Sequence, residues 1–179
     1  MDTIGNIFLQ SAVKRLHSYK ELGDKSLAVL NEAELHFQPN EESNSIVMII
    51  QHMSGNMISR WMDFLTTDGE KEWRKRDEEF EVKQRSKEEV LALWEKGWQV
   101  CLDAIKSLSE ADLEKTIYIR GEGLNVIDAI NRQLAHYPYH VGQIVYIAKM
   151  IKNKDWKSLS IAKNASQEFN ANMHRQHSA

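Results

Sequence analysis

The sequence predicts an all-α protein built as a four-helix bundle with long connections. Three observations favour this class: four long segments carry apolar residues at helical spacing, 42% of the residues are hydrophobic, and the 179 residues include two prolines and eight glycines. A sandwich or barrel of many short strands would need more turn residues than this. The length suits one domain. Helices with one apolar face each can bury those faces together as a bundle.

The first helical pattern runs from about residue 4 to residue 30. Its expected inner residues are Ile7, Phe8, Val13, Leu16, Tyr19, Leu27 and Leu30. Pro39 separates it from a second helix, for which the polar run at residues 43–45 supplies caps. This second helix is expected at residues 45–65. Its apolar stripe, which we interpret as core, is Ile46, Ile50, Met53, Met57, Trp61 and Phe64.

The charged segment of residues 66–85 is predicted to be a long ordered connection, because Trp73 and Phe80 lie among its Lys, Arg and Glu residues. Ser86 and Glu89 have the spacing of a capping box and open a third helix to about residue 108. Twenty residues of helix cover about 30 Å, whereas a connection of this length can extend past 60 Å. It can therefore return along the bundle. This permits an up-down-down-up order, and the simple up-down order also stays open.

The fourth helix begins at Asn125, a favourable cap, and continues to about residue 152. Its expected stripe is Ile127, Ile130, Leu134, Tyr137, Val141, Ile144, Ala148 and Ile151. Before it, residues 116–119 alternate like a strand and stop at Gly121, so a small ribbon is expected. We expect residues 1–152 to form the bundle domain and residues 153–179 a partly ordered C-terminal tail, which packs in its first half and frays at its end.

Charge and composition exclude several classes of function. The chain has 23 basic and 26 acidic residues, a net charge of −3 and no basic half, so no nucleic-acid partner is expected. Its apolar runs are far shorter than a membrane span, and its first residues lack the pattern of a secretory signal. The single cysteine, Cys101, agrees with a reducing compartment. We therefore expect a cytoplasmic protein without a membrane partner.

The positions of the histidines are the feature of the sequence that indicates a chemical function. His136 and His140 are four residues apart in the fourth helix, so their rings project from adjacent turns and could bind one metal ion. His52, beside the stripe of the second helix, offers a third ligand if the two helices face each other. With seven histidines this spacing arises by chance in roughly one sequence in four, so ordinary bundle histidines are the alternative.

Three segments resemble the DinB/YfiT-like superfamily of predicted metalloenzymes, and within it an uncharacterised bacillus-type branch. They are Ser43-Asn44-Ser45-Ile46, His52-Met53-Ser54-Gly55-Asn56 leading to Arg60-Trp61, and His136-Tyr137-Pro138-Tyr139-His140-Val141-Gly142-Gln143. The superfamily signature is one histidine on the second helix and an HxxxH pair on the fourth, followed by Gly-Gln. The resemblance implies a four-helix bundle, often homodimeric, with a divalent metal on His52, His136 and His140.

Three imidazoles suit Zn²⁺, Ni²⁺ or Fe²⁺ and leave a coordination position for water or substrate. The favoured function is a small-molecule enzyme, a thiol-dependent S-transferase in which a low-molecular-weight thiol is cosubstrate. A metal-dependent hydrolase ranks second, because no HExxH glutamate supplies a base. A non-catalytic, stress-related binding bundle is the third alternative. No catalytic residue is assigned.

Two amide side chains, Asn56 and Gln143, lie one helical turn from ligand positions. They are expected to orient imidazoles or hold water, although surface or packing roles are equally compatible with the pattern. Cys101 is expected to be a small core residue and not a nucleophile. Tyr137 falls on the apolar stripe and is expected in the core.

Overall fold

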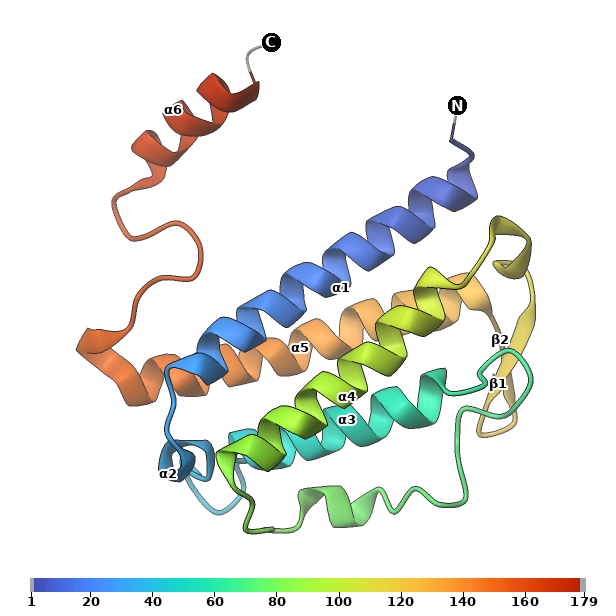
Figure 1. Ribbon diagram of the computed structural model, residues 1–179, viewed down its shortest axis with the longest axis horizontal. Helices are drawn as coiled ribbons and strands as arrows, with labels where there is room; N and C mark the ends of the chain where they lie inside the picture. The colour runs from blue at the N-terminus through green and yellow to red at the C-terminus, as the bar shows by residue number, and fades with distance from the viewer. Residues whose placement is uncertain (1, 178–179) are drawn as a thin grey trace.

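The computed structural model describes residues 2–177 and confirms the all-α, bundle-like prediction (Figure 1). Its four long helices are α1 (Ile4–Ala28), α3 (Ile46–Trp61), α4 (Lys87–Lys106) and α5 (Val126–Lys152). Each begins after a polar cap whose side chain accepts a hydrogen bond from the backbone N–H three residues later. These caps are Thr3, Ser45, Ser86 and Asn125. The predicted starts of the helices are therefore correct.

The helices are arranged in the up-down-down-up order. Figure 1 shows α1 and α5 running in one direction and α3 and α4 in the other. α3 packs against α4 and α5, and α1 packs against the same two helices. The parallel pair α3 and α4 is possible because the connection between them returns along the bundle and places a short 3₁₀ helix, η1 (Asp77–Phe80), against α3.

α3 is the most deeply buried helix. Of its 16 residues only Gly55 and Ile58 are not buried, since α4 and α5 cover one side and the η1 segment covers another. The predicted stripe from Ile46 to Phe64 is in the core throughout. The helix ends at Trp61, earlier than predicted, because Met62 turns to an extended conformation and Asp63 takes a φ of 53°.

Two predicted inner residues are wrong: Ile7 and Ile127 are exposed. α1 packs instead through a face that includes Leu9, Ala12 and Leu16. Small residues on that face let the helices approach closely. A Cβ at Gly23 would collide with the ring of Trp94 on α4, so this glycine marks a close contact between the two helices.

The predicted ribbon is a two-stranded antiparallel hairpin of β1 (Thr116–Ile119) and β2 (Glu122–Asn125). It is tied to the connection after α3. Asp68 accepts hydrogen bonds from the backbone N–H groups of Arg120 and Gly121, both at 2.8 Å, and Gly69 donates its own to Tyr118 O at 2.8 Å. This anchors the first part of the connection that carries η1.

Short helices complete the described chain. α2 (Glu32–Leu35) follows α1, η2 (Glu110–Asp112) follows α4, and η3 (Asn153–Asp155) follows α5. α6 (Ser166–His177), where fraying was expected, is a helix without buried residues that stands apart from the bundle in Figure 1. Trp156 packs partly against the core, as expected for the first half of the tail. The division into a domain of residues 1–152 and a tail of residues 153–179 stays a prediction.

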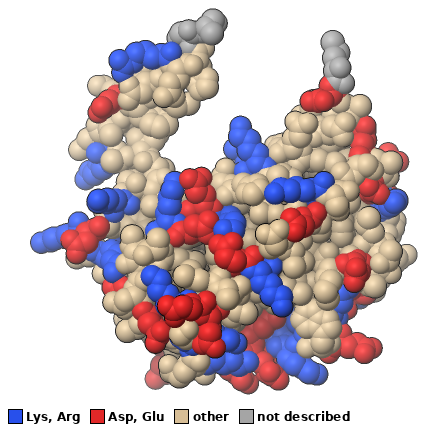
Figure 2. Space-filling view, viewed as in Figure 1, with Lys and Arg blue, Asp and Glu red and all other residues tan. Residues whose placement is uncertain are grey.

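The charged residues are mixed over the surface. Figure 2 shows Lys and Arg side chains next to Asp and Glu side chains across the face that it views. Within residues 2–177, no helix has both the length and the apolar character that a membrane crossing requires.

Candidate metal centre

The structure brings the three predicted ligand residues together. His52 projects from α3, and His136 and His140 project from adjacent turns of α5. One ring nitrogen of each histidine lies within 4.8 Å of those of the other two. The Nε2 atom of His136 is 3.4 Å from Nε2 of His52 and 3.0 Å from Nε2 of His140. Three imidazoles from two helices therefore converge on one point.

The opposite nitrogen of each ring points to an oxygen. Nδ1 lies 3.0 Å from Glu79 Oε2 in His52, 3.3 Å from Gln133 Oε1 in His136, and 2.8 Å from Gln143 Oε1 in His140. An ionised carboxylate and an amide oxygen only accept hydrogen bonds. Each ring therefore carries its proton on Nδ1 and directs the lone pair of Nε2 inward, which is the tautomer that a metal ligand needs.

This donor set fits a divalent cation. Nε2 of His136 lies 3.4 Å from that of His52 and 3.0 Å from that of His140, and nitrogen lone pairs that face one another this closely repel unless a cation lies among them. Metal–nitrogen bonds of about 2.0–2.1 Å in a tetrahedral site would hold the nitrogens about 3.3 Å apart. The observed spacing matches that value. Residues His52, His136 and His140 could therefore bind one ion.

Burial keeps two of the rings neutral. Burial, together with the neighbouring His140 and His52, lowers the pKa of His136 to about 3. Burial also lowers the pKa of His140, although the hydrogen bond with Gln143 opposes this change. Neutral imidazole is the form that binds metal, so these two residues hold no competing proton at neutral pH.

Sequence reasoning missed Glu79, and it also did not single out Gln133 as the partner of His136. Glu79 belongs to η1. Its carboxylate accepts two hydrogen bonds from Arg74, from Nε at 2.8 Å and from Nη2 at 2.9 Å. Burial raises the pKa of Glu79, but the hydrogen bonds from His52 and Arg74 outweigh it, and the pKa lies below its usual value. The carboxylate therefore stays ionised and fixes the ring of His52.

One sequence signal points to Glu79 in retrospect. Gly55 lies one turn after His52 on α3, and a Cβ at this position would collide with the carboxylate of Glu79. The glycine thus leaves room for a side chain from another segment. Charge alone could not reveal this, because residues 66–85 contain many acidic side chains.

The two amides expected beside the ligands have different partners. Gln143 pairs with His140 through Oε1 and donates from Nε2 to Tyr139 Oη at 3.2 Å. Asn56 instead accepts from Tyr137 Oη at 3.1 Å, and Tyr137 Oη accepts from Trp61 Nε1 at 3.0 Å. Asn56 therefore reaches the site only through Tyr137, whose ring centre lies 5.5 Å from that of His136.

Tyr137 and Cys101 are buried in the core, as expected. Burial raises the pKa of the Cys101 thiol well above its usual value, which opposes a role as nucleophile. Pro138 lies between His136 and His140 on α5, and the helix continues through it. Neither Cys101 nor Tyr137 therefore competes with the three imidazoles as a candidate site.

Comparison with known families adds one finding. A family model described as "Protein of unknown function (DUF1572)" matches residues 3–165 and so covers all three histidines, their oxygen partners and the bundle. No curated protein matches the chain significantly.

Proposed function

Because the chain belongs to the DUF1572 family, whose function is unknown, we propose an activity from its site: a divalent-metal-dependent enzyme that acts on a small molecule. One observation supports this above all. Three Nε2 atoms converge while every Nδ1 is held by an oxygen. Supported imidazoles of this kind are typical of metal ligands, and three of them leave a position for a reactant. The resemblance to the DinB/YfiT-like superfamily agrees with the proposal.

We further propose that the reaction is thiol-dependent S-transfer. A divalent cation held there would lower the pKa of a small thiol, so that its sulfur, after losing the proton to water, can attack an electrophilic carbon and displace a leaving group. The chain's part is to hold the three rings in place. Hydrolysis would need a free base, and Glu79, the carboxylate that contacts the cluster, is already engaged by His52 and Arg74. A transfer that needs no protein base is therefore favoured.

The first test is metal content. Protein purified without an affinity tag is expected to carry about one equivalent of Zn, Ni or Fe, measured by mass spectrometry of the metal. His136→Ala is expected to lose it. His17→Ala, which removes an exposed histidine of α1, is the matched control and keeps it. A wild-type chain that binds no divalent metal would favour the non-catalytic bundle instead.

The second test is turnover. Metal-loaded protein is mixed with cysteine and 1-chloro-2,4-dinitrobenzene, and formation of the thioether is followed by absorbance. We expect a rate above that of the uncatalysed reaction, lost in His136→Ala. Stoichiometric metal with hydrolysis of a carboxylic ester and no thioether formation would assign the site to the hydrolase alternative.

A homodimer and a cytoplasmic location, both expected from the sequence analysis, remain part of this proposal. The free and buried Cys101 agrees with a reducing compartment. Light scattering of the full chain tests the dimer, and a mass of one chain would contradict it. Cell fractionation tests the location.

A further inference from the structure

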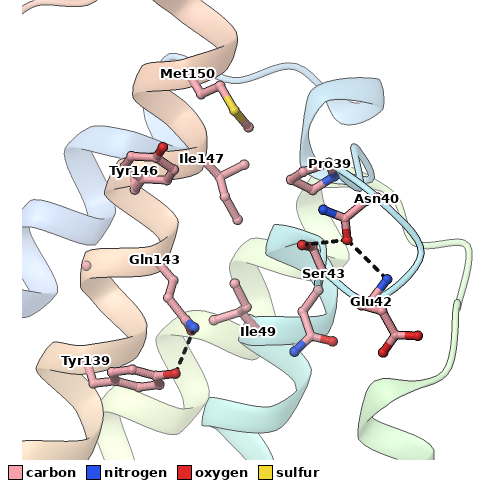
Figure 3. Close-up of a pocket in the computed structure, with 12 residues that line it drawn as sticks. Pro39, Asn40, Glu42, Ser43, Ile49, Tyr139, Gln143, Tyr146, Ile147 and Met150 are labelled. Carbon is pink, nitrogen blue, oxygen red and sulfur yellow. Dashed lines mark hydrogen bonds between the residues drawn. The ribbon is translucent and has the colours of Figure 1, made fainter.

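A hollow of about 690 Å³ lies beside the histidine cluster, between α5, the first turns of α3 and the loop of residues 39–44. Figure 3 shows Ile147 and Met150 pointing from α5 toward this loop, with Ile49 from α3 below them. The loop contributes Asn40 and Ser43 to the opposite wall. The hollow is therefore apolar on its helical side and polar on its loop side.

The hollow is connected to the candidate metal site through Gln143. This side chain lines the hollow and accepts a hydrogen bond from His140. It also donates one to Tyr139, which lines the hollow as well (Figure 3). Ile49 lies one helical turn before His52 on α3. A molecule in the hollow would thus contact the residue that orients one ligand, and its reactive end could extend toward the cluster.

The helical wall exposes large apolar side chains. Tyr139 is 62% exposed, Tyr146 71% and Met150 42%, and all three lie on one strip of α5. Apolar side chains that gather around a concavity are typical of a binding site. The buried Ile49 and Ile147 also line the hollow. This wall therefore suits a ligand with an aromatic or branched aliphatic body.

The charged residues around the hollow indicate which charge a ligand's head group would have. Among the twelve lining residues, all within the described part of the chain, Glu42 is the only charged one. The chain has four glutamates and no Lys or Arg between residues 26 and 59, and α5 has no Asp, Glu, Lys or Arg between residues 133 and 148. Lys152, farther along α5, pairs with Glu34 at 2.7 Å. The one charged residue among these twelve is therefore acidic, which favours a cation and opposes an anion.

We propose that the hollow binds a hydrophobic amine, with its ammonium group at Glu42 and its body against Ile49, Ile147 and Tyr146. The aromatic side chains add to the preference for a cation. This inference rests on the proposed function, for which it names the substrate class: the amine is the part of the electrophilic substrate that does not react. It does not depend on which metal the histidines bind.

The test uses three probes of one shape and different charge: 2-phenylethylamine, 2-phenylethanol and 3-phenylpropionate. Binding to the full-length wild-type chain is measured by saturation-transfer NMR and calorimetry at pH 7. The amine is expected to bind about two- to fivefold more tightly than the alcohol, the range that one exposed charge pair supplies. The carboxylate is expected to bind more weakly than both. Equal or tighter binding of the carboxylate, or no binding of the amine at millimolar concentration, overturns the inference.

Two variants locate the binding. Glu42→Gln is expected to reduce the affinity for the amine to that for the alcohol, whereas Glu41→Gln, the neighbouring glutamate outside the lining, leaves both unchanged. Gly142→Leu tests the hollow itself. A Cβ at Gly142 meets no atom within 4 Å, so the added side chain fits the helix and takes up part of the hollow. It is expected to weaken the amine and the alcohol alike by at least about tenfold. Unchanged amine binding in Gly142→Leu would overturn the inference, provided its thermal unfolding matches the wild type.

Failure of this inference is distinct from failure of the proposed function. His136→Ala removes the metal and is expected to keep the amine affinity within about twofold, because His136 does not line the hollow. If the chain binds metal but not the amine, only the proposed substrate class is contradicted. If the chain binds the amine but takes up no metal, the proposed enzymatic function is contradicted and an amine-binding protein is left.

Discussion

The chain has two close histidine pairs, His136 with His140 on α5 and His174 with His177 on α6, and the two pairs differ in their burial and in their place in the fold. The pair on α5 is partly buried and faces His52 across the bundle. The pair on α6 belongs to a helix without buried residues that stands apart in Figure 1. The comparison teaches that spacing only permits chelation. A third imidazole and an oxygen at each outer nitrogen make the first pair a candidate site.

The largest effect is expected when the two pairs are removed in turn. His136→Ala with His140→Ala is expected to lower metal affinity by more than about 100-fold, because loss of a ligand exceeds the 10–100-fold cost of losing its outer partner. His174→Ala with His177→Ala is expected to leave it unchanged. Calorimetric titration with Zn²⁺ measures both. Equal losses in the two double variants would show that the metal is bound without regard to the bundle.

A smaller effect is expected from Glu79, since His52 is the one histidine of the three whose Nδ1 faces a carboxylate and not an amide oxygen. Glu79→Gln keeps a hydrogen-bond acceptor but loses the charge, and it is expected to lower Zn²⁺ affinity about 10-fold, at the low end of the range for such partners. Glu78→Gln alters the adjacent, more exposed glutamate and is the control. If both variants bind Zn²⁺ like the wild type, Glu79 has no part in orienting His52.

The same carboxylate also affects folding. Glu79→Ala leaves Arg74 buried without its partner, and this is expected to lower the free energy of unfolding by about 3 kcal/mol. Denaturant titration of the metal-free protein measures it, so that metal binding does not enter the result. Glu79→Ala combined with Arg74→Met should recover part of the loss, and no recovery in the double variant would contradict a buried ion pair.

The Tyr137 network is expected to matter for stability more than for metal. Asn56→Ala removes the acceptor of the buried Tyr137 hydroxyl, and the expected cost is about 1 kcal/mol in the free energy of unfolding. Zn²⁺ affinity is expected to change by less than about threefold. A large loss of affinity in this variant would place Asn56 at the site more directly than its hydrogen bond suggests.

The smallest effect is expected from removal of α6, the helix that carries His174 and His177. A chain that ends at residue 163 lacks α6, whose residues are all exposed or partly exposed. Its thermal midpoint and Zn²⁺ affinity are expected to match those of the full chain, as is usual for a terminal segment with few buried contacts. Loss of metal on truncation would show that α6 contributes to the site.

Sequence patterns predicted the bundle well where they repeat. The caps Ser45, Ser86 and Asn125 gave the starts of three helices, and the stripe of α3 gave a core face. The phase of α1 was missed at Ile7, because small residues such as Gly23 mark its contact with Trp94 and carry little hydrophobic signal. α6 was missed because none of its described residues is buried, so it has no apolar face that a helical pattern would reveal.

The candidate site, like the fold, was predicted in part and missed in part. Helical spacing indicated His136 and His140 as a pair, His52 was a third ligand only if the two helices face each other, and the resemblance to the DinB/YfiT-like superfamily implied all three. Glu79 was not singled out, because its distance from His52 depends on the path of an irregular connection, which no periodicity describes. The hollow beside Gln143 also could not be predicted, since α3, α5 and the loop of residues 39–44 form it only after the chain has folded.

The central claim is that imidazoles from α3 and α5 share one cation, and X-ray absorption at the metal edge tests it most directly. The metal-loaded wild-type protein is expected to show three imidazole nitrogens at about 2.0–2.1 Å, and His52→Ala is expected to show two. A spectrum that is the same in both proteins, or that shows no imidazole scattering, would contradict the claim.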